Sequence, residues 1–126
     1  MEPHSIQPGF AFRLRVEESH LFVVITTPDC EGNVLVVNMT TLKVTTEDRS
    51  CVLNAGDHPF VTHPTAINYG EYHDPRILPA EEIRRRILKG EFIKQEPLSG
   101  DTLSRVLQGA AVSRHMRNKY KELLNV

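Results

Sequence analysis

The sequence lacks long hydrophobic runs and contains few cysteines. No stretch of 18 apolar residues occurs, so we expect no membrane-spanning helix. The first ten residues, MEPHSIQPGF, contain neither a basic segment nor an apolar one, so we expect no signal peptide. The two cysteines, Cys30 and Cys51, follow no metal-binding or redox spacing. These features indicate a reduced, cytoplasmic protein.

Several catalytic signatures are also absent. The chain contains no GxGxxG, P-loop, GxSxG or HExxH pattern. Their absence argues against a nucleotide-cofactor enzyme, a P-loop ATPase, a lipase-type hydrolase and a zincin. A zinc site built from Cys30, Cys51, His58 and His63 is an alternative, but only the two histidines lie near each other in the sequence.

The length and composition are those of one globular domain. The chain has 126 residues, of which 40% are hydrophobic, so a single core can form. Its net charge of -1 is unevenly distributed: residues 1–75 contain four Lys or Arg and ten Asp or Glu, whereas residues 76–126 contain eleven and six. This asymmetry indicates either an anionic partner for the basic half or mutual attraction of the two halves.

Strand-like patterns precede helical ones along the chain. The alternating or continuous apolar segments that predict strands are 10–16, 20–27, 34–39, 51–53, 60–61 and 66–69. A helix is expected to open near Pro79 and end at Gly90, and a longer one to follow a cap at Ser99 or Asp101. We therefore expect one α+β domain, with residues 1–75 mainly β and residues 76–126 mainly helical. Its sheet would be a small, SH3-like, curled antiparallel sheet or barrel, followed by the C-terminal helices.

The segment 50–69, SCVLNAGDHPFVTHPTAINY, has the composition of a rigid loop that carries polar chemistry. His58 and His63 each stand beside a proline, and a Gly-Asp turn precedes the first. Binding and catalytic groups concentrate on such loops. The alternative is a structural loop whose histidines hydrogen-bond to the backbone.

A second group of polar residues follows from the expected hairpin of 20–27 and 34–39. In that hairpin, His20 and Thr40 lie at the same open end, with Thr41 beside them. A histidine can accept a proton from a ribose 2′-OH, and a hydroxyl can bind a phosphoryl oxygen. A nearby cation, Arg15 or Lys43, would stabilise the developing charge. The alternative is that the threonines are simply strand-forming residues and His20 a turn residue.

The order of these segments resembles the MazF/PemK family of toxin endoribonucleases, the Kid and CcdB-like SH3-type barrels. The resemblance is architectural. It rests on the Gly-led entry at 8–10 (PGF), the apolar run at 20–26 (HLFVVIT), the strand ending in threonine at 36–41 (VVNMTT) and the layout of residues 66–124. The loop GDHPFVTHPT is not part of the family pattern.

The resemblance implies the toxin of a type II toxin–antitoxin system, which cleaves single-stranded RNA without a metal or other cofactor. It also implies a homodimer and an antitoxin protein as partner. Thr40 matches the family's catalytic threonine, whereas His20 stands where the family has arginine. The candidate catalytic residues are therefore His20, Thr40, His58 and His63, and the candidate substrate-binding residues are Arg15, Thr41, Lys43 and Tyr69.

Two other functions compete with this hypothesis. One is a non-catalytic SH3-like module that binds a protein or nucleic acid through its basic helices. The other is a metal-dependent hydrolase that uses His58 and His63. Substitution of the histidines by alanine would alter turnover in an enzyme, and only stability or binding in a non-catalytic module.

Overall fold

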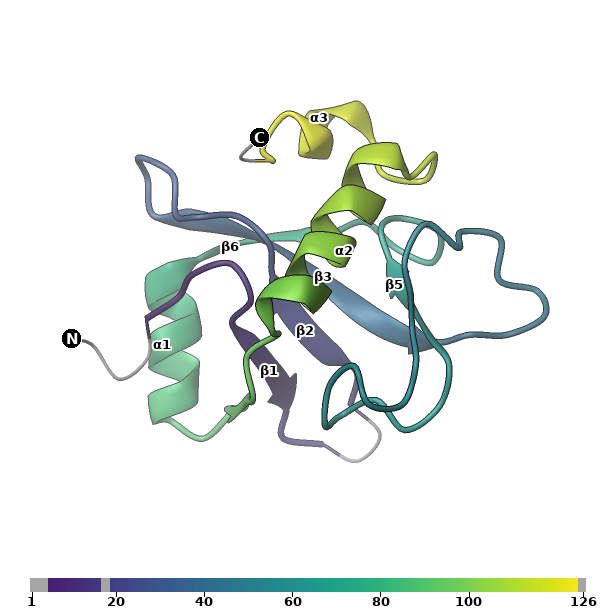
Figure 1. The fold of residues 1–126 in the computed structure, drawn as a ribbon. Coiled ribbons are helices and arrows are strands. Elements are labelled where there is room, and N and C mark those ends of the chain that lie inside the picture. The colour runs from purple at the N-terminus through teal and green to yellow at the C-terminus, as the bar shows by residue number, and fades with distance from the viewer. Residues whose placement is uncertain (1–4, 17–18, 125–126) are drawn as a thin grey trace.

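The fold is organised around an antiparallel sheet. The computed structural model of the chain describes residues 5–16 and 19–124 (Figure 1). Within them, the strands are β1 (Ala11–Leu14), β2 (Leu21–Val24), β3 (Asn33–Thr41), β4 (Val52–Leu53), β5 (Thr65–Asn68), β6 (Arg76–Pro79) and β7 (Phe92–Gln95). The helices are α1 (Ala80–Leu88), α2 (Gly100–Val112) and α3 (Asn118–Lys121).

The strands form one sheet in the order β4-β5-β3-β2-β1-β7, and every ladder is antiparallel. The long strand β3 pairs with β6 along its first half and with β5 along its second half. This confirms the α+β class and the expected meander of the first three strands. Within the described residues no ladder joins β4 to β7, so the sheet is open and not a closed barrel.

Both faces of the sheet are buried, as the strand sequences require. In β3, Leu35 and Val37 belong to a core on the face that α2 covers. Val34 and Val36 belong to a second core on the opposite face, which includes Ile83 of α1. Successive residues of a strand point to opposite faces, so a strand covered on both sides has a continuous apolar sequence.

The two main helices follow the expected boundaries. After α1, Gly90 adopts a φ of 78°, which a glycine tolerates and which ends the helix. At the start of α2, the Ser99 hydroxyl accepts a hydrogen bond of 3.2 Å from the Thr102 N–H. Ser99, and not Asp101, is therefore the cap of α2.

Two segments differ from the expectation. Residues 60–61 form no strand; Val61 N–H instead closes a turn by donating to the His58 carbonyl. Arg76–Pro79 forms β6, although its sequence has no clear alternation, because its backbone pairs with β3. Residues 92–95 form β7 beside β1. Consequently α1 lies between two strands in the sequence, and not all the helices follow the sheet.

Candidate functional site

A cavity of about 450 Å³ opens where β2 begins and β3 ends. Phe22 pairs with Asn38, and continuing that register by two residues places His20 opposite Thr40. The loop before β5 completes the wall. The cavity is lined by Ser19, His20, Met39, Thr40, Thr41, Phe60, Val61, His63 and Thr65. The structure thus brings together four of the residues proposed from the sequence, which are His20, Thr40, Thr41 and His63.

His63 is held by hydroxyl groups on both sides of its ring. Its Nε2 lies 3.0 Å from Thr41 Oγ1, and its Nδ1 lies 3.2 Å from Thr62 Oγ1. Its backbone carbonyl accepts a 2.8 Å hydrogen bond from the Thr65 hydroxyl. Since a hydroxyl can donate or accept, this arrangement suits either tautomer of the ring as well as the protonated form. The imidazole is therefore oriented without being fixed in one protonation state.

His20 approaches the cavity from the opposite strand. It is exposed, and its backbone carbonyl accepts a 2.8 Å hydrogen bond from the Ser19 hydroxyl. The same Ser19 oxygen accepts a 2.9 Å hydrogen bond from the Leu14 N–H, which ties the start of β2 to the end of β1. Ser19 thereby positions the backbone of His20 at the cavity.

The cavity combines polar and apolar walls. Met39 and Val61 are buried and belong to the core that packs against α2, and Phe60 packs against the same core. The hydroxyl and imidazole groups occupy the remaining wall. A site of this kind suits a ligand with one flat apolar part and one hydrogen-bonding part.

His58 lies outside this cavity and serves the structure. It is 4% exposed. The Phe60 N–H donates to its Nδ1 over 3.0 Å, so the proton of a neutral ring is on Nε2, which donates to the Glu96 carbonyl over 2.5 Å. His58 therefore connects the loop between β4 and β5 (residues 54–64, the histidine loop) to the segment after β7. For His58, this matches the alternative in which the loop histidines bond to the backbone.

The remaining sequence candidates do not line the cavity. Tyr69 is fully buried, its hydroxyl donates to the Val106 carbonyl over 2.6 Å, and burial raises the pKa of Tyr69. Arg15 extends toward Gly90 after α1, where a β-carbon on that glycine would lie 3.3 Å from the guanidinium. Lys43 follows β3, and its backbone groups bond to Thr46 and Arg49.

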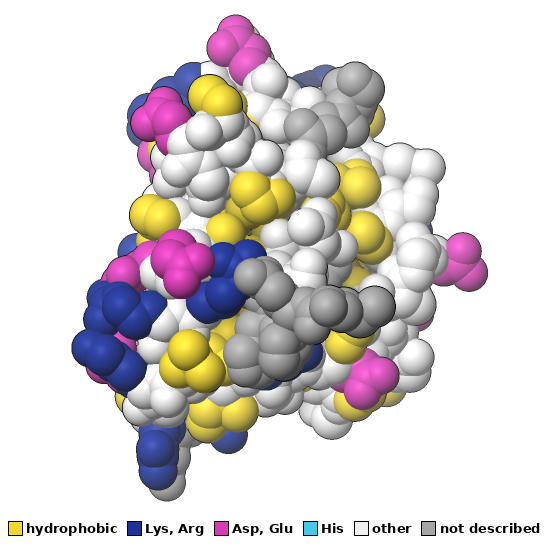
Figure 2. Space-filling view, turned by 90° about the vertical axis from the view of Figure 1, so that its left-hand side faces the viewer, with side chains coloured by type: hydrophobic (Ala, Val, Ile, Leu, Met, Phe, Trp, Pro, Cys, Tyr) yellow, Lys and Arg dark blue, Asp and Glu magenta, His cyan; other side chains and the backbone are white. Residues whose placement is uncertain are grey.

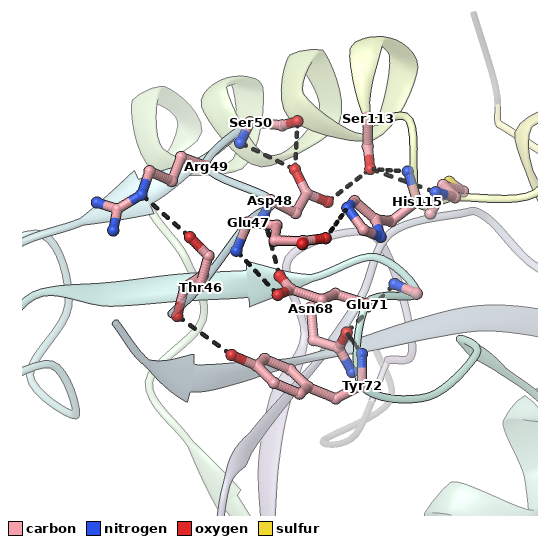
Figure 3. A network of polar contacts seen from close by, with 12 residues as sticks. Thr46, Glu47, Asp48, Arg49, Ser50, Asn68, Glu71, Tyr72, Ser113 and His115 are labelled. Carbon is pink, nitrogen blue, oxygen red and sulfur yellow. Dashed lines mark hydrogen bonds and ion pairs between the residues drawn. The ribbon is translucent and has the colours of Figure 1, made fainter. Parts of the chain in front are cut away.

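A separate polar network fixes the loop that follows β3 (Figure 3). Asp48 is 6% exposed and accepts hydrogen bonds of 2.6 Å from the hydroxyls of Ser50 and Ser113. Burial acts to raise the pKa of Asp48, but these hydrogen bonds outweigh it and leave that pKa below its ordinary value. Because Ser113 follows α2, the network joins the loop to that helix.

The same network includes a second carboxylate. Glu71 accepts 2.9 Å hydrogen bonds from the backbone N–H groups of Glu47 and Asp48, which lower the pKa of Glu71. His115 Nε2 lies 3.7 Å from Glu47 Oε1, and Figure 3 shows this contact beside Ser113. The polar groups of this network form hydrogen bonds mainly with one another, so the network has a structural role.

The described residues contain no group of three or more His, Cys, Asp or Glu side chains that could hold a metal ion. The four residues considered for zinc are dispersed. Cys30 is exposed at the turn between β2 and β3, whereas Cys51 is buried, which raises the pKa of its thiol. No helix in the described ranges is both long and apolar enough to cross a membrane.

Comparison of the chain with models of protein families, with curated proteins and with solved structures gives no match.

Several residues at the site were not proposed from the sequence, among them Ser19, Phe60 and Thr62. Ser19, Phe60 and Thr62 contribute a backbone contact, an apolar wall and a bond to His63, respectively. Thr62 precedes His63, so its proximity was readable from the sequence. The orientation of the Thr62 hydroxyl toward His63 Nδ1 depends on the conformation of the loop, so the sequence did not predict it.

Proposed function

We propose that the cavity between β2, β3 and the histidine loop binds single-stranded RNA and cleaves it, and that the protein is a divergent toxin of the MazF/PemK type. One observation carries the proposal: His20, His63 and the threonines Thr40 and Thr41, from separate segments of the chain, line a single cavity of about 450 Å³. The order of β1, β2 and β3, with β5 returning beside β3, supports an SH3-like relative of that family whose sheet is open.

In the proposed reaction, His63 accepts the proton of a ribose 2′-OH. The 2′-oxygen attacks the adjacent phosphorus, and the bond from phosphorus to the 5′-oxygen breaks. His20, protonated at the start, donates its proton to that leaving oxygen. The products are a 2′,3′-cyclic phosphate and a free 5′-hydroxyl, so atoms and protons balance without a metal.

The threonines take the binding role in this scheme. The Thr41 hydroxyl, which contacts His63 Nε2, would turn to the substrate when the 2′-OH occupies that position. The Thr40 hydroxyl would donate to a non-bridging phosphoryl oxygen. None of the described residues that line the cavity is Lys or Arg, so the protonated His20 supplies the positive charge next to the phosphate.

The test is cleavage of an end-labelled, mixed-sequence single-stranded RNA by the purified protein in excess EDTA. Alanine at His20 or at His63 should lower the cleavage rate by two or more decades, which is typical for removal of a general acid or base. Thr40→Val removes the hydroxyl with little change in shape and should cost about tenfold. His73→Ala, which alters an exposed histidine outside the cavity, is the matched control and should cleave at the wild-type rate.

Two results would contradict the proposal. Undiminished cleavage by both the His20 and the His63 variants, with normal circular dichroism spectra, would remove the site assignment. RNA left intact by the wild-type protein would favour the non-catalytic binding module. Co-purification of a small protein partner and the mass of the particle in solution would then test the antitoxin and the homodimer, which the resemblance also implies.

A further inference from the structure

An aromatic groove lies on the sheet face that carries α1, outside the cavity described above. It has a volume of about 300 Å³, and its floor contains Phe12, Phe22 and Phe92 from β1, β2 and β7. Arg76 of β6 and Arg86 of α1 stand at its sides. Figure 2 views the molecule from the side of α1, where clusters of Lys and Arg lie beside acidic side chains and hydrophobic patches.

The three phenylalanines form a continuous stack across the strands. The rings of Phe12 and Phe22 have centroids 5.5 Å apart at an interplanar angle of 13°. Those of Phe12 and Phe92 have centroids 4.6 Å apart at 20°. Phe12, at the centre, is 1% exposed, while the two outer rings are only partly buried. The stack therefore presents parts of two aligned aromatic rings to solvent in the groove.

The two arginines differ in how far their charge is already neutralised. The Arg86 guanidinium lies 5.5 Å from the Phe92 ring centroid and is bonded to Glu82 and Glu91. Arg76 is exposed and makes no ion pair with any residue that the structure describes. It thus offers a solvated guanidinium directly beside a flat aromatic surface.

The groove and the proposed active site share a strand. Phe22 follows His20 by two residues, so along an extended chain their Cα atoms are about 7 Å apart. Phe22 also pairs with Asn38, two residues before Thr40 in β3. A polymer that passes His20 and Thr40 therefore reaches the aromatic groove two residue pairs further along the β2–β3 ladder.

We propose that this groove binds a nucleobase of the RNA strand beside the cleaved linkage, with the base against Phe22 and Phe92 and a phosphate on Arg76. The inference rests on the proposed function. Aromatic side chains that stack on bases, next to cations that contact the backbone, are the usual means of binding single-stranded RNA. An apolar peptide segment would use the phenylalanines but would leave the Arg76 guanidinium without a counter-charge.

The experiment measures binding separately from cleavage. The probe is a fluorescein-labelled 2′-O-methyl RNA of about ten nucleotides, which cannot undergo attack by a 2′-OH, and the readout is fluorescence anisotropy. Phe22→Leu keeps an apolar side chain but removes the ring, and should raise the dissociation constant about tenfold. Arg76→Ala should raise it about fivefold and should lower the salt dependence by about one phosphate contact. Arg114→Ala, at an exposed arginine outside the groove, is the control and should bind as the wild type does.

The outcomes separate this inference from the function on which it rests. If both groove variants bind the RNA with wild-type affinity and the wild type cleaves RNA, the proposal that the groove binds a base is wrong, whereas the proposed active site stands. Weakened binding in both variants, without any RNA cleavage by the wild type, would support the groove and contradict the proposed reaction. Absence of binding by the wild-type protein would overturn both.

Discussion

At the scale of single residues, the two histidines of the loop before β5 illustrate how surroundings determine chemistry. His58 is buried, and both of its ring nitrogens are bonded to backbone groups. His63 is exposed, and both of its ring nitrogens face hydroxyl groups. A hydroxyl can reverse its role and a backbone group cannot, so only His63 can gain or lose a proton without losing its hydrogen bonds.

Removing the hydroxyl of Ser113 should make stability at neutral pH fall. In Ser113→Ala the carboxylate of Asp48 loses its 2.6 Å hydrogen bond, and we expect a loss of about 1–3 kcal/mol in the free energy of unfolding. Because the pKa of Asp48 is lowered in the folded protein, this stabilisation is present above its unfolded pKa of about 3.9. It is lost as the pH falls through the folded value.

Urea unfolding of the wild type and of Ser113→Ala, at pH 7 and at successively lower pH, checks this. The difference between the two proteins should shrink as the solution becomes acid. A difference independent of pH would show that Ser113 acts through packing or through the hydrogen bonds that its hydroxyl accepts from the His115 and Met116 N–H groups, and not through the charge of Asp48. Ser104→Ala, which removes a hydroxyl from an exposed position of α2, serves as the control.

The sequence could place some of these residues and not others. It brought His20 and Thr40 together correctly, because the register of a short hairpin follows from the turn between its strands. It could not separate His58 from His63, because both stand next to proline in the same loop. Their difference arises from Glu96, which is 38 residues away from His58 in the chain.

At the scale of secondary structure, the packing of α2 on the sheet depends on one close approach. A β-carbon at Gly109 would lie 2.5 Å from the Tyr69 hydroxyl oxygen and 2.9 Å from the Cys51 β-carbon. Both are closer than non-bonded contact allows. The glycine therefore lets α2 approach β4 and β5 closely enough for Tyr69 to bond to the Val106 carbonyl.

Gly109→Ala should destabilise the fold by about 1–3 kcal/mol despite the better helix propensity of alanine, because a packed core resists insertion. Gly100→Ala, in the same helix with nothing within 4 Å of the added carbon, is the matched control. It should leave stability unchanged within about 0.5 kcal/mol. Thermal and urea unfolding measure both, and equal stabilities for the two variants would refute the close approach.

Elements with strong local signals were predictable, whereas those that depend on pairing were not. The boundaries of α1 and α2 follow from Gly90 and Ser99, which act within one turn of the helix. The strand β6 has a mostly exposed sequence and exists because β3 is long enough to pair with two partners along one edge. The free length of the β3 edge beside β5 exists only in the folded sheet, so the sequence of residues 76–79 alone does not predict this strand.

At the scale of the whole molecule, ion pairs neutralise part of the positive charge of residues 76–126. Ion pairs link Arg105 to Asp57 at 3.2 Å and Arg117 to Asp74 at 3.5 Å, each joining the basic part of the chain to the acidic part. Within α1, the pairs Arg84–Glu81 and Arg85–Glu82 neutralise arginine charges with carboxylates of the same helix. The charge asymmetry of the sequence therefore overstates the positive surface available to RNA.

Because ion pairs neutralise part of the positive charge, we expect the affinity for RNA to depend only weakly on salt concentration. With Arg76 and a protonated His20 as the main contacts, the slope of log affinity against log salt should be about -1.4, corresponding to two phosphates on a single strand. Titration of the 2′-O-methyl RNA at several salt concentrations measures it. A slope steeper than about -4 would mean that further Lys and Arg side chains of the basic helices contact RNA phosphates in addition to Arg76 and His20.

The exposure of Cys30, set against the burial of Cys51, gives the protein a natural attachment point for a spectroscopic probe. A maleimide dye should react at the turn between β2 and β3 and spare the thiol beneath α2. That turn is at the opposite end of β3 from the cavity, about 30 Å away along nine extended residues. Energy transfer from a dye at Cys30 to one on either end of a bound oligonucleotide would then reveal the direction in which the strand runs.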